Sequence, residues 1–218
     1  MSTEPTKITR EIHNYLEENF SHDDDFLKKL IKRSEELGFP QIHISPLQSG
    51  FLQMMIKTIN AKKVLEIGSL AGYSAISMAK AMPDDGELIA VEINPKYASF
   101  IRERVSEVGL ENIIKVENIH ALDYLEDLDR HTEYDLVFID ADKKNYLNYA
   151  KKVTPFVRKR GVLIADNALG FGHIVDKDPE RANEVKPIRD FNKWFSDNPE
   201  FFTSFVTIGD GLIIGVKQ

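Results

Sequence analysis

The chain has 218 residues, 42% of them hydrophobic, which suits one α/β domain with a sizeable core better than two domains. It contains no cysteine, and this excludes disulfides, thiolate nucleophiles, zinc–thiolate sites and iron–sulfur clusters. The net charge of −7 disfavours general attraction to the phosphates of nucleic acids.

No targeting or membrane segment is recognisable in the chain. Residues 1–16 carry charges at Glu4, Lys7, Arg10 and Glu11 and lack the apolar stretch of a signal peptide. No apolar run approaches the length of a membrane span. We therefore expect a cytoplasmic protein with no membrane partner.

The first 60 residues are expected to form a helical extension. Helical periodicity covers residues 8–18, 25–37 and 46–59. The third segment has the clearest start, because Ser45 and Gln48 have the spacing of a capping box and Pro46 occupies the first helical position. Residues 61–218 would then form the core of a single domain that spans residues 1–218.

From residue 63 onward, short apolar runs alternate with helical stretches. The five apolar runs, each a candidate strand, are residues 64–67, 88–91, 113–116, 136–139 and 162–165. The helical stretches between them are residues 72–82, 95–108, 121–128 and 145–157. This alternation predicts a parallel sheet covered by helices.

The chain ends differently from its middle. A polar segment, residues 168–183, is followed by a predicted helix near residues 185–196. Two strand-like runs, residues 202–208 and 212–216, then flank the turn sequence Gly209-Asp210-Gly211. We interpret them as an antiparallel hairpin that makes the sheet mixed at one edge.

The first group of candidate functional residues follows the first two strands. In a parallel sheet, ligands bind beyond the carboxyl ends of the strands, where Gly68 and Gly72 would let a ligand approach the backbone. Glu92 lies 20 residues after Gly72, an interval typical of an acidic residue that binds a ribose diol. These features favour an adenosine ligand, although the spacing is not that of a dinucleotide or phosphate-loop motif. The alternative is that the glycines only shape a turn and Glu92 only opens a helix.

The second group follows strands four and five. Asp140, Asp166 and Asn167 present two carboxylates and an amide oxygen, the ligands that Mg²⁺ or Ca²⁺ prefers. Lys143 could reach the same crevice and act as a base. The alternatives are that the acidic residues cap helices or turns and that the lysine is simply exposed.

The six histidines show no metal-ligand or catalytic-triad spacing. One of them, His173, is a candidate for substrate contact because it follows the Asp166-Asn167 pair. The others are assigned structural or surface roles: His13, His22, His43, His120 and His131.

Over residues 42–216 the motifs, in this order, resemble one known family. They are Ile44-Ser45-Pro46, Val64-Leu65-Glu66-Ile67-Gly68 with Gly72-Tyr73-Ser74, Val91-Glu92-Ile93-Asn94-Pro95, Phe138-Ile139-Asp140-Ala141-Asp142-Lys143 and Asp166-Asn167. The family is that of metal-dependent class I O-methyltransferases, which includes catechol and caffeoyl-CoA O-methyltransferases, and the chain is similar to its bacterial members.

The resemblance implies an α/β, Rossmann-like fold of seven mostly parallel strands, with helices on both faces and the last strand antiparallel. It implies S-adenosylmethionine as the methyl donor, a divalent metal (Mg²⁺ first, Ca²⁺ or Mn²⁺ as alternatives), a small phenolic substrate and a homodimer. The donor-binding positions would be Ile44, Glu66, Gly68, Ser69, Gly72, Ser74, Glu92, Ala121, Asp140 and Asp142. The metal ligands would be Asp140, Asp166 and Asn167, and the catalytic residues would be Lys143, as the base, and Asp140.

The acceptor is the least defined part of the resemblance. Many plant members continue Thr-Leu-Trp-Asn after the Asp-Asn pair, whereas this chain has Ala168-Leu169-Gly170-Phe171. This difference disfavours a caffeoyl-CoA ester, so a small catechol-like aromatic with adjacent hydroxyls is the first hypothesis.

Two other functions remain open. The runner-up is methylation of 5-hydroxyuridine at the wobble position of tRNA, since that base also presents adjacent oxygens. The acidic balance and the flanking of Arg181 by Glu180 and Glu184 disfavour it. A protein that binds the donor without catalysis is the third possibility, and the intact Asp140 and Lys143 argue against it.

Overall fold

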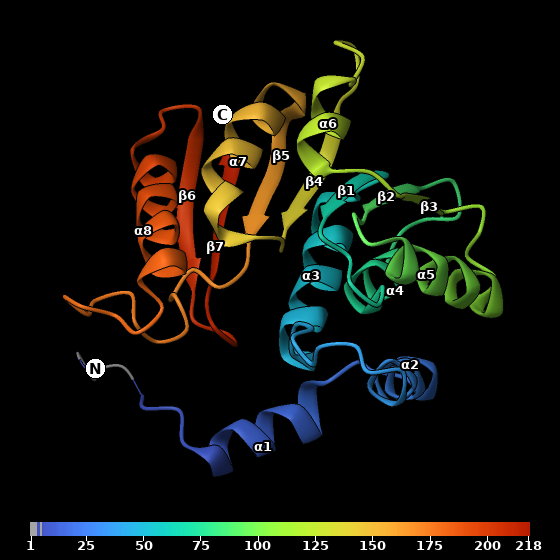
Figure 1. Cartoon of the computed structure of the whole chain (residues 1–218), viewed down its shortest axis with the longest axis horizontal. Coiled ribbons are helices and arrows are strands. Elements are labelled where there is room, and N and C mark those ends of the chain that lie inside the picture. Colours follow the sequence, from blue (N-terminus) through green and yellow to red (C-terminus); the bar gives the residue numbers. More distant parts are fainter. Residues whose placement is uncertain (1–3, 5) are drawn as a thin grey trace.

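A computed structural model describes residue 4 and residues 6–218, so the start of the predicted domain, residues 1–3 and 5, lies outside the described part. The three N-terminal helices are confirmed as α1 (Arg10–Phe20), α2 (Asp25–Glu36) and α3 (Pro46–Ile59). Each helix is preceded by an N-cap residue, Thr9, Asp24 or Ser45, whose side chain accepts a hydrogen bond from a backbone N–H of the first turn. The predicted capping box of α3 is present, and α1 and α2 lie beyond α3, away from the sheet (Figure 1).

The core is one seven-stranded sheet, which confirms the predicted mixed architecture. Its strands are β1 (Lys63–Ile67), β2 (Glu87–Val91), β3 (Ile114–Glu117), β4 (Tyr134–Ile139), β5 (Val157–Ala165), β6 (Phe201–Val206) and β7 (Leu212–Lys217). They are ordered β3-β2-β1-β4-β5-β7-β6. Strand β7 runs in the opposite direction to the other six, so it is antiparallel to both β5 and β6, and the remaining pairs are parallel. The strand order reverses between β1 and β4, and a ligand crevice is expected at such a switch point.

Helices cover both faces of the sheet (Figure 1). Besides α3 these are α4 (Tyr73–Ala79), α5 (Pro95–Val108), α6 (Ala121–Glu126), α7 (Tyr146–Val153) and α8 (Ala182–Asp197). Alternate residues of β1 point to opposite faces: Val64 packs in the core beneath α3, α4 and α5, whereas Leu65 and Ile67 pack beneath α6, α7 and α8. Among the described residues, none of the helices combines the length and apolar character that crossing a bilayer requires.

The predicted helix over residues 145–157 is wrong in its extent. A 3₁₀ turn, η1 (Lys143–Asn145), precedes α7, and a second, η2 (Thr154–Phe156), ends the helical region, because Pro155 cannot continue an α-helical hydrogen-bond ladder. Strand β5 then begins at Val157, five residues earlier than its apolar run. Its first residue, Val157, is followed by three basic residues, of which Arg158 pairs with Asp135 on the adjacent strand β4.

Candidate functional site

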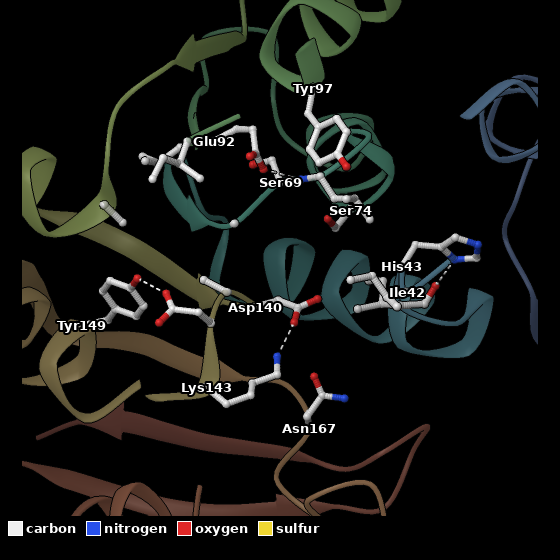
Figure 2. A pocket seen from close by; sticks show the side chains of 18 of the residues that line it. Ile42, His43, Ser69, Ser74, Glu92, Tyr97, Asp140, Lys143, Tyr149 and Asn167 are labelled. Atoms are coloured by element: carbon white, nitrogen blue, oxygen red, sulfur yellow. Dashed lines mark hydrogen bonds and ion pairs between the residues drawn. The ribbon is translucent and has the colours of Figure 1, made fainter. Parts of the chain in front are cut away.

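A cavity of ≈ 720 Å³ opens where the carboxyl ends of the parallel strands meet. Gly68 follows β1, Glu92 follows β2, Asp140 follows β4 and Asn167 lies just beyond β5, and all four line the cavity (Figure 2). The predicted convergence of these strand-end residues is therefore confirmed. Polar groups gathered in one concave site at a switch point are the usual setting for ligand binding.

The turn after β1 brings two strand ends into contact. Gly68 has φ +89°, and a Cβ atom there would collide with the carbonyl oxygen of Asp140. Only glycine fits this position, so the first glycine of the motif allows the ends of β1 and β4 to approach closely. Gly72 is the N-cap of α4 with φ +79°, and a Cβ atom there would come within 3.0 Å of the Ile101 side chain.

Glu92 is a buried carboxylate held by backbone groups at the β2 side of the cavity (Figure 2). Its Oε2 accepts a hydrogen bond from the Leu70 amide, and its Oε1 accepts one from the Asn94 amide, both at 2.8 Å. Burial raises the pKa of Glu92, and these backbone amides counteract the rise. The carboxylate is thus fixed in place with acceptor capacity left for a ligand hydroxyl.

Glu66 lies behind this wall of the cavity and is fully buried. Its Oε2 accepts a short hydrogen bond from the Ser69 hydroxyl, while its Oε1 has no hydrogen-bond partner among the described residues. Burial raises the pKa of Glu66 to about 7. A buried carboxylate oxygen without a partner is a group that a bound cation or hydrogen-bond donor would stabilise.

The raised pKa of Glu66 has a consequence for the pH dependence of stability. The folded protein binds this proton more tightly than the unfolded chain does, so stability is lost as pH rises from about 4.5 through about 7. We expect Glu66→Gln to stabilise the ligand-free protein more at pH 8 than at pH 5, by roughly 2 kcal/mol. Urea denaturation of both proteins at the two pH values measures the change in unfolding free energy that the substitution causes. A cost of burying the amide that does not depend on pH is the same at both pH values and cancels in the comparison. An effect of the substitution that is equal at both pH values would contradict the prediction.

Lys143 and Asp140 lie side by side at the end of the cavity that follows β4 (Figure 2). Lys143 Nζ donates hydrogen bonds to Asp140 Oδ1 at 2.9 Å and to the hydroxyl of Tyr146 at 2.6 Å. Tyr146 is fully buried, and burial together with the charge of Asp140 raises the pKa of its hydroxyl far above the usual range. The lysine amine is therefore held at a defined place in the cavity wall by one charged and one neutral partner.

Asp166 and Asn167 complete a cluster of oxygen ligands beside Asp140. Burial, followed by the negative charge of Asp140, raises the pKa of Asp166 to about 7. Asn167 has φ +54°, and its Nδ2 donates to Asp210 Oδ2 at 3.2 Å. That bond engages the amide nitrogen, and the amide oxygen remains an acceptor that a ligand could use.

These three residues fit a hard divalent cation. Burial and the negative charge of Asp140 both favour the protonated form of Asp166, and a divalent cation would offset them, since oxygen donors are what Mg²⁺ and Ca²⁺ prefer. Within the described residues, no group of three His, Cys, Asp or Glu side chains could hold a metal ion. A cation bound beside Asp140 and Asp166 would therefore need the amide oxygen of Asn167 as its third protein ligand.

Most of the residues predicted from sequence are brought together by the fold. Those that line the cavity are Ile44, Gly68, Ser69, Ser74, Glu92, Ala121, Asp140, Asp142, Lys143 and Asn167. Glu66, Gly72 and Asp166 are not among the described residues that line the cavity, but each adjoins one that does: Glu66 bonds to Ser69, Gly72 precedes Tyr73 and Asp166 precedes Asn167. His173 is also absent from that lining and pairs with Asp176 instead.

Several lining residues were not identified from sequence. His43 and His120 were assigned structural or surface roles, yet both line the cavity. His120 follows β3, so the rule that the crevice lies beyond strand ends could have found it. Tyr149 had no such signal: its hydroxyl donates a short hydrogen bond to Asp142 across the cavity wall (Figure 2).

The polar segment after Asn167 forms one side of the cavity. The Arg181 guanidinium stacks 3.4 Å from the centre of the Phe171 ring, and it also forms an ion pair with Glu184 at 2.7 Å. All three residues line the cavity. This side of the cavity therefore presents an aromatic ring and an arginine whose charge is balanced by Glu184.

The sequence of this chain is similar to those of known O-methyltransferases. A family model described as O-methyltransferase matches residues 17–218. The catechol O-methyltransferase of Niastella koreensis is 32% identical over 214 residues, covering 97% of this chain and 94% of its own length. Caffeoyl-CoA O-methyltransferase 2 of Petunia hybrida is 37% identical over 173 residues, covering 75% of this chain and 72% of its own.

Solved structures show the same architecture. An O-methyltransferase from Bacillus cereus, in complex with SAH, superposes with a TM-score of 0.88 at 27% identity, covering 95% of this chain and 97% of that one. The O-methyltransferase TomG from Streptomyces achromogenes, in complex with SAM, superposes with a TM-score of 0.86 at 26% identity, covering 95% and 96%.

Proposed function

This chain belongs to the O-methyltransferase family, and from that premise we propose that it transfers the methyl group of S-adenosylmethionine to a hydroxyl of a small catechol-like aromatic, assisted by a divalent cation. The observation that carries the proposal is one cavity with a buried carboxylate, Glu92, at its β2 side. Its other end holds a lysine beside a cluster of oxygen ligands, namely Lys143 with Asp140, Asp166 and Asn167.

The donor would occupy the part of the cavity built by β1 and β2. Glu92 would accept hydrogen bonds from the ribose hydroxyls, and the unpartnered carboxylate oxygen of Glu66 would stabilise the donor's ammonium group. The remaining donor contacts would come from Ile44, Gly68, Ser69, Gly72, Ser74, Ala121, Asp140 and Asp142. The SAH and SAM complexes of the Bacillus cereus and Streptomyces achromogenes proteins support this choice of donor.

We expect Glu92→Gln to weaken S-adenosylhomocysteine binding by about 10-fold to 100-fold, because hydrogen bonds to a charged group are worth about 1.5–3 kcal/mol. The amide retains the shape of the side chain but removes its charge and one acceptor oxygen. Isothermal titration calorimetry measures the affinity. Glu117→Gln, at an exposed position of β3, is the matched control and should bind like the wild type. Equal affinities in both variants would contradict a ribose-binding role for Glu92.

Asp140, Asp166 and Asn167 would hold the cation, with Mg²⁺ the first choice and Ca²⁺ or Mn²⁺ as alternatives. When bound, such an ion would act as a Lewis acid that lowers the pKa of the reacting hydroxyl, and an acceptor with a second adjacent hydroxyl would suit it. The adjacent hydroxyls of a catechol match this requirement, which is why we place the acceptor in that chemical class.

Lys143 would accept the proton of the reacting hydroxyl. Its amine lines the cavity and is held 2.9 Å from Asp140 Oδ1, so Nζ would receive the proton at a defined place. The acceptor oxygen then forms a bond to the methyl carbon as the carbon–sulfur bond breaks, and the sulfonium becomes a neutral thioether. Because one cavity holds both reactants, much of the rate gain would come from their alignment.

The experiment that tests the function offers two acceptors to the same enzyme. Methyl transfer from labelled donor is measured with 3,4-dihydroxybenzoate and with tRNA carrying 5-hydroxyuridine, each with Mg²⁺ and with a chelator. Metal-dependent labelling of the catechol alone is the expected result. Labelling of the tRNA alone would establish the runner-up, and undiminished transfer in chelator would remove the metal from the proposal.

We also propose that residues 1–218 act as one methyltransferase domain and that the protein is a homodimer. Exposed apolar side chains on α1, Tyr15 and Phe20, support the second proposal because they offer surface for a second copy. Sedimentation equilibrium would test it, and a monomeric mass would overturn it.

A further inference from the structure

Gln48, in the first turn of α3, connects this helix to the residues that follow β5. Its side chain is almost fully buried. Its Oε1 accepts hydrogen bonds from the backbone N–H of Ser45 at 2.9 Å and from the Ser45 hydroxyl at 3.0 Å. Its Nε2 donates to Asp166 Oδ1 at 2.6 Å, across 118 positions of sequence. One amide therefore completes a helix cap with its oxygen and holds a carboxylate with its nitrogen.

The β6–β7 turn confines this amide from another side. Gly209 has φ +58°, and a Cβ atom at this position would collide with Oε1 of Gln48. The side chain is thus fixed by Ser45, by Asp166 and by the turn backbone. A buried group held from three directions has little freedom to reorient, so the Asp166 oxygen that it binds is also fixed.

We propose that Gln48 is a positioning residue for the metal ligand Asp166. Its N–H holds Oδ1 of the carboxylate and directs Oδ2 to a cation that Asp140 and Asn167 share. A neutral donor is suited to this task, because it satisfies one carboxylate oxygen without supplying the positive charge that the cation would bring. The inference rests on the metal site of the proposed function, and it concerns a residue outside the ligand set.

Direct Mn²⁺ binding to the donor-free protein, followed by electron paramagnetic resonance, tests the proposal without measuring turnover. Gln48→Met retains the length of the side chain and removes all three hydrogen bonds of its amide. We expect its Kd for Mn²⁺ to rise about 10-fold to 100-fold, the usual effect of removing a hydrogen-bond partner from a metal ligand.

Ser45→Ala is the matched control for the loss of the helix cap. It removes the capping hydroxyl, at a cost of about 1 kcal/mol in stability, and leaves the bond from Gln48 to Asp166 in place. Its Mn²⁺ affinity should equal that of the wild type, although its melting temperature should fall like that of Gln48→Met. Equal loss of affinity in both variants would show that the cap, not the bond to Asp166, matters.

A second pair of variants perturbs Gln48 without changing it. Gly209→Ala should displace the Gln48 side chain and weaken Mn²⁺ binding in the same direction as Gln48→Met. Gly38→Ala is its control, because Gly38 also has a positive φ, +75°, but a Cβ atom there meets nothing within 4 Å. Gly38→Ala should bind Mn²⁺ like the wild type.

The Mn²⁺ measurements distinguish failure of the metal site from failure of the positioning role of Gln48. If the wild type binds no Mn²⁺, the metal site fails, and the role of Gln48 fails with it. If the wild type binds Mn²⁺ and Gln48→Met binds it equally well, the metal site stands and the positioning role is overturned.

Discussion

Replacing Lys143 with methionine is expected to lower kcat by about 10²-fold to 10⁴-fold, the usual contribution of a general base. Methionine is unbranched and apolar, so the substitution removes the amine that bonds to Asp140 and Tyr146 and leaves most of the packing. Donor affinity should remain unchanged, because Lys143 is not among the proposed donor contacts. Initial rates at saturating donor, acceptor and Mg²⁺ measure the first effect, and calorimetry with S-adenosylhomocysteine measures the second.

The pH dependence of the variant gives an independent test of the role of Lys143. Without a base, the residual rate should rise with pH, as a growing fraction of the acceptor hydroxyl ionises in solution. Lys152→Met is the matched control, since Lys152 lies on α7 and pairs with Glu126 at an exposed position. A Lys143→Met enzyme with the kcat of this control would show that another group removes the proton.

Asp140→Asn is expected to lower kcat/KM by about 10³-fold, because a catalytic cation contributes several kcal/mol of transition-state stabilisation. The substitution keeps the shape of the side chain while removing a charge from the proposed metal site, and it removes the carboxylate partner of Lys143. Assays across a range of Mg²⁺ concentrations measure the loss. Excess Mg²⁺ should restore part of the rate if weakened metal binding is the main cause.

The control for Asp140→Asn is Asp197→Asn, which changes the same atoms in an exposed ion pair with Lys193 at the end of α8. It should leave the rate and its Mg²⁺ dependence unaltered. A wild-type Mg²⁺ dependence in Asp140→Asn would contradict the assignment of Asp140 as a metal ligand, even if the rate itself fell.

Local sequence patterns predicted most elements of the fold because each pattern reflects a short-range constraint. The start of α3 was correct since Ser45, Pro46 and Gln48 act on one helical turn. The five parallel strands and the terminal hairpin were correct because apolar runs of this length must be buried in a sheet. The start of β5 was missed because Arg158 belongs to the strand through its pairing with Asp135, which no local pattern reveals.

The candidate site likewise contains residues that the sequence predicted and residues that it did not. The positions of Gly68, Glu92, Asp140 and Asn167 were predictable, since a parallel sheet brings every residue that follows a strand to one edge. The lining by His43 was not predicted, because it depends on how the segment before α3 crosses the mouth of the cavity.

The sequence by itself determined the fold class and the edge of the sheet where chemistry can occur, since both follow from periodicity and chain order. Only the tertiary structure decided which side chains orient the candidate ligands. Gln48 reaches Asp166 across 118 residues, and Asp210 reaches Asn167 across 43. The physical reason is that hydrogen bonds act over about 3 Å in space, so their partners are known only once distant segments pack together.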